Sequence, residues 1–159
     1  MRPAKFCITL FAFTTLALQC AFALRTEKNA TVPMELQKYD RAIAPYVAEA
    51  RTTYPAAKKR FLAGLPRGYT FAVWLRLYEK DKQNRIIYFE DCFVSVERIA
   101  DGRFYGRLEN KPTMVHGHSL GEKVSGEESE IRNWMIERPD GSEEGNVVGK
   151  FLEKHYMPK

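Results

Sequence analysis

The spacing of apolar residues changes once along this chain, and that change limits the folds open to it. Between residues 33 and 62 apolar side chains recur at three- and four-residue steps, which is typical of a helix with one face on a core. After Gly68 two runs rich in aromatic and β-branched residues, 69–78 and 86–99, follow each other with only a polar turn between them. This order argues against a βαβ arrangement.

The helical part contains two prolines and ends at a clear stop signal. Pro45 and Pro55 interrupt the pattern, so we expect a broken helix or two helices, over 34–44 and 46–62. The segment 64–68 begins and ends with glycine and contains a proline, which is typical of a helix end.

The strand part continues to the C-terminus with short elements. In order, we expect a tight turn at Asp101-Gly102, a strand over 103–108, a loop over 113–126, an element around 131–136, a turn at Asp140-Gly141, and a helix over 147–155 capped by Asn146. The sequence therefore predicts an α+β fold. Its N-terminal helices pack on an antiparallel β-meander, and a short C-terminal helix follows.

The first 23 residues have the three parts of a secretory signal. A basic start is followed by the uncharged run 6–18 and by the small residues Ala21 and Ala23 around a cleavage site. The apolar run is shorter than the roughly 20 residues of a membrane span. The alternatives are a buried N-terminal helix and an uncleaved anchor. We expect a signal peptide at 1–23, a flexible leader at 24–32 and a single domain at 33–159.

Cys20 allows a second way of processing the N-terminus. In a lipoprotein the acylated cysteine follows a small residue, whereas Cys20 follows the bulky Gln19. Cleavage after Ala23 is therefore favoured, with a periplasmic or secreted product. Processing at Cys20 is the alternative and would give a lipid-anchored one.

Loss of the signal changes the charge and the cysteine content. Removing Arg2 and Lys5 lowers the formal net charge from +5 to +3, and the basic residues that remain form no long block. We therefore expect no nucleic-acid partner. Cys92 becomes the only cysteine and lies in an apolar run, so we expect a buried side chain and no internal disulfide.

Gly117-His118-Ser119-Leu120-Gly121 matches the nucleophile elbow of hydrolases, and Asp140 and His155 follow in the expected order. That elbow needs a buried strand before the serine and a packed helix after it. Here the preceding segment is no buried strand and the following one is too polar for a core helix. We expect a glycine-rich surface loop, with a small hydrolase using Ser119 as the alternative.

His116 and His118 are two residues apart, so on a strand both side chains would lie on the same face and could bind one metal ion. A zinc site needs at least three ligands, and His155 is the only other histidine. We therefore expect exposed loop histidines and no metal site.

Two pairs of adjacent acidic residues, Glu90-Asp91 and Glu127-Glu128, are candidates for acid–base groups. Neighbours along a strand point to opposite faces, so neither pair presents two acids to one substrate. Trp74 and Trp134 are expected to be core anchors. The sequence thus predicts no catalytic, cofactor-binding or metal-binding residues and no cofactor.

These segments together resemble the YegJ-like bacterial domain family of unknown function. The resemblance covers roughly residues 48–155 and is carried by Gly106-Arg107-Leu108-Glu109-Asn110-Lys111-Pro112, by Ile131-Arg132-Asn133-Trp134 and by a glycine-containing end. The family motifs are G-x-L-x-N-x-P and I-x-D-W, so Asn133 replaces the usual aspartate. The resemblance implies a compact α+β domain in exported bacterial proteins and transfers no catalytic residues. Because an amide does not readily transfer protons, the second motif is expected to be structural here, and Asn110 is expected to form a turn.

The patterns favour a non-enzymatic exported domain that binds a protein or cell-envelope partner. One specific form is an immunity-type protein that neutralises a toxin.

Overall fold

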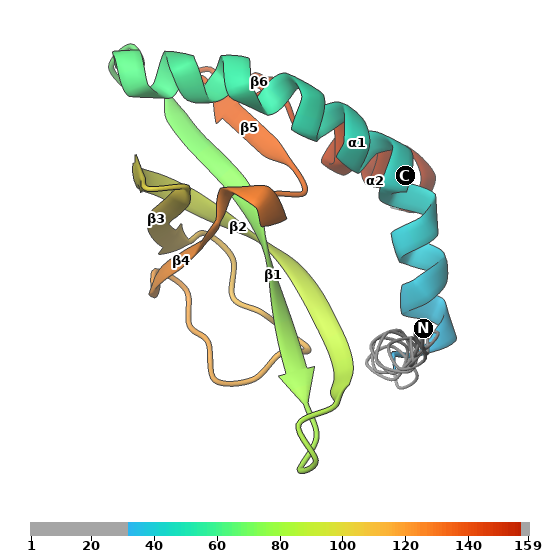
Figure 1. Ribbon diagram of the computed structural model, residues 1–159. Coiled ribbons are helices and arrows are strands. Elements are labelled where there is room, and N and C mark those ends of the chain that lie inside the picture. Colours follow the sequence, from blue (N-terminus) through green and yellow to red (C-terminus); the bar gives the residue numbers. More distant parts are fainter. Residues whose placement is uncertain (1–31, 157–159) are drawn as a thin grey trace, which may run out of the picture. The chain divides into compact units, whose positions relative to one another are not determined.

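The helices and strands follow the predicted order, and the computed structural model describes residues 32–156. The predicted signal peptide, nearly all of the leader, and Cys7 and Cys20 lie outside the described residues. The elements are α1 (Met34–Ala63), β1 (Thr70–Lys80), β2 (Ile86–Ala100), β3 (Arg103–Leu108), β4 (Lys123–Glu127), the 3-10 helix η2 (Glu128–Glu130), β5 (Trp134–Glu137), β6 (Glu143–Gly145) and α2 (Val147–Tyr156) (Figure 1).

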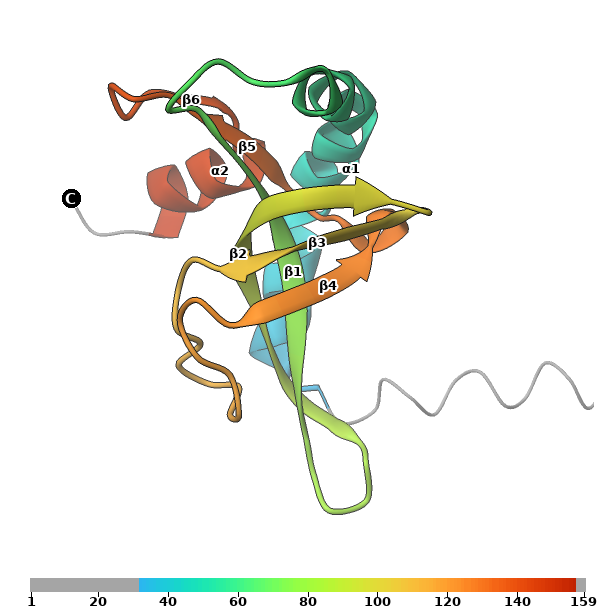
Figure 2. The ribbon, with the colours of Figure 1, turned by 90° about the vertical axis from the view of Figure 1, so that its left-hand side faces the viewer.

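The strands form one six-stranded sheet in the order β4-β3-β2-β1-β5-β6, and every neighbouring pair is antiparallel. The α+β prediction is confirmed. In the predicted turn after β2, Asp101 and Gly102 both have positive φ, 54° and 74°, as a two-residue hairpin turn requires. β2 pairs with β1 up to Ser95 and then bends away with β3 and β4, so the sheet is strongly twisted (Figure 2).

The two expected N-terminal helices are one continuous helix. α1 runs through Pro45 and Pro55 without a break, although each proline removes a backbone hydrogen bond at a cost of about 3 kcal/mol. It changes direction along its length (Figure 1), as prolines inside a helix cause it to do. Buried side chains lie before, between and after the prolines, and their packing offsets the cost. Neither helix in the described part is long and apolar enough to cross a membrane.

The two faces of β1 belong to two apolar clusters, and α1 contributes to both. We call face 1 the side of the sheet that carries Phe71 and Val73, and face 2 the side that carries Trp74. Face 1 packs with the later part of α1, including Tyr54, whereas face 2 packs with its earlier part, including Ile43. The helix therefore passes from one face of the sheet to the other, and α2 packs against it on face 2.

The predicted loop over 113–126 is partly wrong, because its last residues form β4. The sequence of β4 has a single large apolar residue, Val124, so its pairing with β3 gives no periodic signal. Gly126 lies where an added Cβ would be 2.6 Å from the Phe104 ring, so close packing against β3 explains the glycine. The three-residue strand β6 was also not expected.

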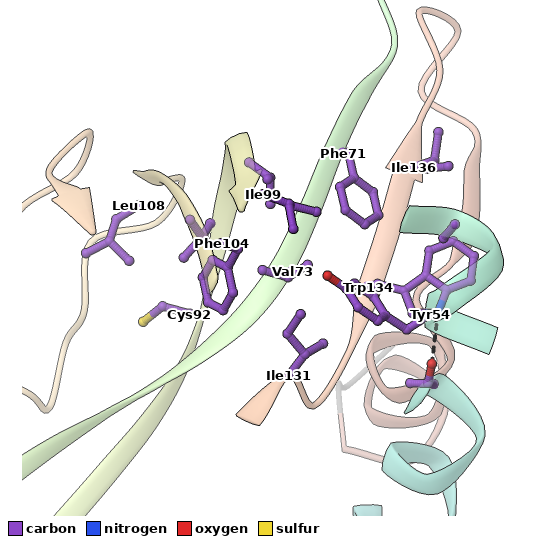
Figure 3. Packing of buried hydrophobic residues seen from close by; sticks show 14 of the residues in the cluster. Tyr54, Phe71, Val73, Cys92, Ile99, Phe104, Leu108, Ile131, Trp134 and Ile136 are labelled. Atoms are coloured by element: carbon purple, nitrogen blue, oxygen red, sulfur yellow. Dashed lines mark hydrogen bonds between the residues drawn. The ribbon is translucent and has the colours of Figure 1, made fainter. Parts of the chain in front are cut away.

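The predicted core residues are buried. Cys92 is fully buried, and both Trp74 and Trp134 are more than nine-tenths buried. The indole N–H of Trp134 donates to the carbonyl oxygen of Ala50 at 3.1 Å and to Thr53 Oγ1 at 2.9 Å, so it ties β5 to α1 (Figure 3). Both tryptophans are core anchors, as predicted.

Candidate functional site

The G-x-S-x-G segment lies in the loop between β3 and β4. Ser119 is exposed, and its backbone N–H donates to Glu122 Oε2 at 2.9 Å. Asp140 accepts hydrogen bonds within the β5–β6 turn, at the opposite edge of the sheet, and His155 lies in α2. The structure does not bring the three residues together. The surface-loop prediction is confirmed.

The two loop histidines contact different carboxylates. Nδ1 of His116 is 3.3 Å from Glu79 Oε2, and Nδ1 of His118 is 3.2 Å from Glu122 Oε1. Backbone N–H groups of the same loop donate to both acids, and these bonds are the main reason why the pKa values of Glu79 and Glu122 are lowered. In residues 32–156 no three His, Cys, Asp or Glu side chains are grouped to hold a metal.

The adjacent acid pairs separate as predicted. Glu90 accepts backbone N–H groups of the β3–β4 loop on face 1, while Asp91 points to face 2 and pairs with Arg76. Glu127 pairs with β3, and Glu128 accepts a hydrogen bond and an ion pair from α1. Neither pair presents two carboxylates to one point.

Face 2 contains a buried charged network that the sequence analysis missed. Arg76 donates to both oxygens of Asp91, from Nε at 2.8 Å and from Nη2 at 2.6 Å, and from Nη1 to Asp40 Oδ2 at 2.9 Å. Its guanidinium lies 3.6 Å from the centre of the Phe89 ring. The side chains of Arg76 and Asp91 are only 8% and 2% exposed. Tyr39 completes the group by donating its hydroxyl to Asp91 Oδ2 at 3.3 Å.

Arg132 joins the network from the segment before β5. Its Nη2 donates to Asp40 Oδ1, and its Nε lies 3.7 Å from Asp91 Oδ1. That Nε is buried and has no hydrogen-bond partner among the described residues. Two arginines and two aspartates therefore balance one another, which is how buried charges are usually accommodated.

The network also fixes protonation states. Burial raises the pKa of the Tyr39 phenol, and the charge of Asp91 raises it further, so the hydroxyl stays a donor. Burial alone would lower the pKa of Arg76, but its hydrogen bonds to Asp91 and Asp40 outweigh this and leave the pKa raised. The donors therefore keep their protons over the whole physiological range.

A hollow of about 370 Å³ opens beside this network, and we call it the arginine hollow. It is bounded on α1 by Asp40, Arg41, Ala44, Val47, Ala48 and Arg51, and on the other side by Arg132. Nε of Arg51 donates to the carbonyl oxygen of Ile131 at 2.9 Å, which fixes one end of its guanidinium. The hollow thus has three guanidinium groups and one carboxylate around a floor of small apolar side chains.

The residues that carried the family resemblance serve the fold. A Cβ on Gly106 would lie 2.0 Å from the Ser95 carbonyl oxygen, so only glycine fits there. Leu108 is buried in the core. Asn110 does more than form a turn, because its Oδ1 accepts the backbone N–H of Phe93 at 2.8 Å.

Three residues of the second motif have structural roles, as predicted, whereas its Arg132 lines the arginine hollow. Ile131 and Trp134 belong to the core, and Asn133 between them is fully buried. Its Nδ2 donates to Asn146 Oδ1 at 2.7 Å, and Asn146 Nδ2 donates in turn to Glu143 Oε2 at 2.7 Å. Both polar atoms of the Asn146 side chain are thus used in these hydrogen bonds. Its backbone oxygen accepts the N–H of Lys150, which is the first hydrogen bond of α2.

A model of a bacterial family, described as an uncharacterized protein conserved in bacteria (DUF2314), matches residues 40–154. The chain belongs to this family. The part that matches the DUF2314 model starts at Asp40 and includes the whole charged network except Tyr39, as well as the arginine hollow. No curated protein and no solved structure matches the chain. Membership in DUF2314 confirms a bacterial domain of unknown function and assigns it no activity.

One sequence signal could have pointed to the network. Arg76 is the only charged residue within the run 69–78. An isolated charge in a strand otherwise made for the core needs a partner when buried. The partners Asp40 and Arg132 have no such signal, because they lie among other polar residues.

Proposed function

We propose that this chain is an exported, non-enzymatic domain that binds a protein or cell-envelope partner through the arginine hollow. The observation that carries the proposal is the hollow itself, where hydrogen bonds hold the guanidinium groups of Arg51 and Arg132 beside small apolar side chains. Its volume lies within the range of sites that bind small ligands, about 300–1,000 Å³.

The charged network supports a binding role because it holds the hollow in place. Asp40 accepts from Arg76 on one oxygen and from Arg132 on the other. Arg76 is in turn held by two bonds to Asp91. Groups fixed before a ligand arrives lose less conformational entropy on binding, which raises affinity.

Export and the finer family assignment belong to the same proposal. The basic, apolar and small-residue parts of the first 23 residues support secretion, with cleavage after Ala23 and residues 33–159 as the folded domain. The two motifs support a YegJ-like protein within the wider family. An immunity-type role is the form in which a small exported domain would bind one specific toxin.

Fractionation and capture test this proposal in one strain. The full chain with a C-terminal tag should be found in the periplasm or medium, shortened by the signal peptide. Chemical cross-linking there should repeatedly recover the same partner. The double variant Arg41→Gln with Arg51→Gln should lose that partner, while Arg67→Gln, an exposed arginine outside the hollow, should keep it. Retention in the cytosol, or equal recovery by all three chains, would contradict the proposal.

A small hydrolase using Ser119 is the second candidate. The observation in its favour is that Glu122 contacts both the Ser119 backbone and the His118 ring, so a serine, a histidine and an acid share one loop. An esterase and glycosidase substrate panel with Ser119→Ala as control separates the two functions. Turnover that depends on Ser119 would favour the hydrolase.

A further inference from the structure

Resting on the proposed binding function, we infer that the arginine hollow recognises a carboxylate on an acidic peptide segment of a protein partner. The inference adds the chemistry of the ligand, and it depends on how the charges around the hollow are distributed.

The charges at the hollow do not cancel. Asp40 pairs with both Arg76 and Arg132, and Asp91 pairs with Arg76 at 2.6 Å and lies 3.7 Å from Arg132. The two carboxylates therefore balance these two guanidinium groups. Arg41 and Arg51 add two positive charges at the rim, and no ion pair links either of them to a carboxylate within residues 32–156. The hollow therefore attracts an anion.

Arg51 is oriented for a planar anion. Its Nε bond to the Ile131 carbonyl oxygen fixes the guanidinium plane, while its two terminal nitrogens have no intramolecular partner in the described part of the chain. Two parallel N–H groups from one guanidinium match the two oxygens of a carboxylate. Arg132 lines the same hollow, with a buried Nε that has no hydrogen-bond partner among the described residues.

The floor of the hollow favours a peptide side chain over a free ion. Ala44, Val47 and Ala48 offer apolar contacts that suit the methylene groups of aspartate or glutamate. A lone inorganic anion would leave most of the roughly 370 Å³ unfilled.

Fluorescence anisotropy with a defined probe tests the inference. The probe is a labelled octapeptide of alternating glutamate and alanine, and its control has glutamine in place of glutamate. At low salt the acidic peptide should bind and the amide peptide should not. Arg51→Gln should weaken binding at least about tenfold, because it removes both parallel charge-assisted hydrogen bonds. Arg51→Lys should weaken binding less than Arg51→Gln but should not restore the wild-type affinity, because lysine retains the charge but not the two parallel donors.

Arg67→Gln removes the same charge from an exposed site outside the hollow, and it should change the affinity by less than about twofold. Equal weakening by Arg67→Gln and Arg51→Gln would overturn the inference, since net charge alone would then explain binding. Displacement of the peptide by inorganic phosphate at equal concentration would also overturn it and would indicate a site for small anions.

The two proposals fail separately. If Arg51→Gln abolishes capture of the native partner but the acidic peptide never binds, the binding function stands and the acidic ligand is wrong. If the peptide binds at Arg51 but no partner is ever recovered, the ligand chemistry stands and the proposed function is wrong.

Discussion

Replacing Asn133 by aspartate tests the hydrogen bonds that link Asn133, Asn146 and Glu143, and it introduces the residue that the resembling motif carries. Asn133 is fully buried, and its Nδ2 donates to Asn146 Oδ1 at 2.7 Å. Aspartate has nearly the same shape, so packing is preserved. The ionised carboxylate, however, has no proton to donate and would face another oxygen. The protonated acid restores a donor, so the folded protein holds a proton at this position.

The cost follows from that proton. Aspartate in an unfolded chain has a pKa of about 3.9, and each pH unit above it adds about 1.4 kcal/mol to the cost of keeping the acid protonated. At about pH 7 this amounts to about 4 kcal/mol. The folded pKa is raised, so the folded state binds more protons than the unfolded state and stability falls as pH rises. Near pH 4 the cost should almost vanish.

Urea denaturation of Asn133→Asp and the wild type, at several values between about pH 4 and about pH 7, measures this difference. Asn84→Asp is the matched control, because Asn84 is exposed in the β1–β2 turn. It should cost less than about 1 kcal/mol at every pH. A loss for Asn133→Asp that is equally small, or that does not change with pH, would refute the buried amide bond.

Two further predictions concern buried groups. Arg76→Met removes the guanidinium that is paired with buried Asp91 and leaves only the longer contacts to Tyr39 and Arg132, so it should cost about 3 kcal/mol in urea denaturation. Adding Asp91→Leu should recover most of that loss. A single variant no less stable than the double would contradict the ion pair. Burial raises the pKa of Cys92 to about 11, so the folded protein should resist thiol reagents near pH 8 and react once unfolded. Mass spectrometry locates the label, and rapid native labelling at Cys92 would show that the core is open.

The elements that sequence could predict are those set by nearby residues. The strand over 103–108 and the turn before it were predicted with the bounds observed, because Asp101-Gly102 accepts positive φ and strand-forming residues flank it. The C-terminal helix was predicted to within one residue, Val147–His155 against Val147–Tyr156. Burial of Trp74 and Trp134 follows from the same local patterns.

The elements that sequence could not predict depend on distant contacts. Pro45 and Pro55 indicate a break, and only packing on both faces of the sheet explains why α1 continues. The charged network has the same cause. The pairing of β1 with β2 places Arg76 opposite Asp91, and the crossing of α1 brings Asp40 to them, across 36 residues of sequence from Arg76.

The energetics of that network give a reason to connect it with binding. A buried ion pair often contributes little to stability compared with apolar residues of similar size, because desolvation offsets the attraction. The double variant Arg76→Met with Asp91→Leu is therefore expected to fold. It would no longer hold Asp40 and Arg132 in place, because Arg76 is the group that joins Asp40 to the sheet. If the network serves the arginine hollow, this well-folded variant should bind the acidic peptide more weakly than the wild type. Unchanged affinity would mean that the network serves the fold alone.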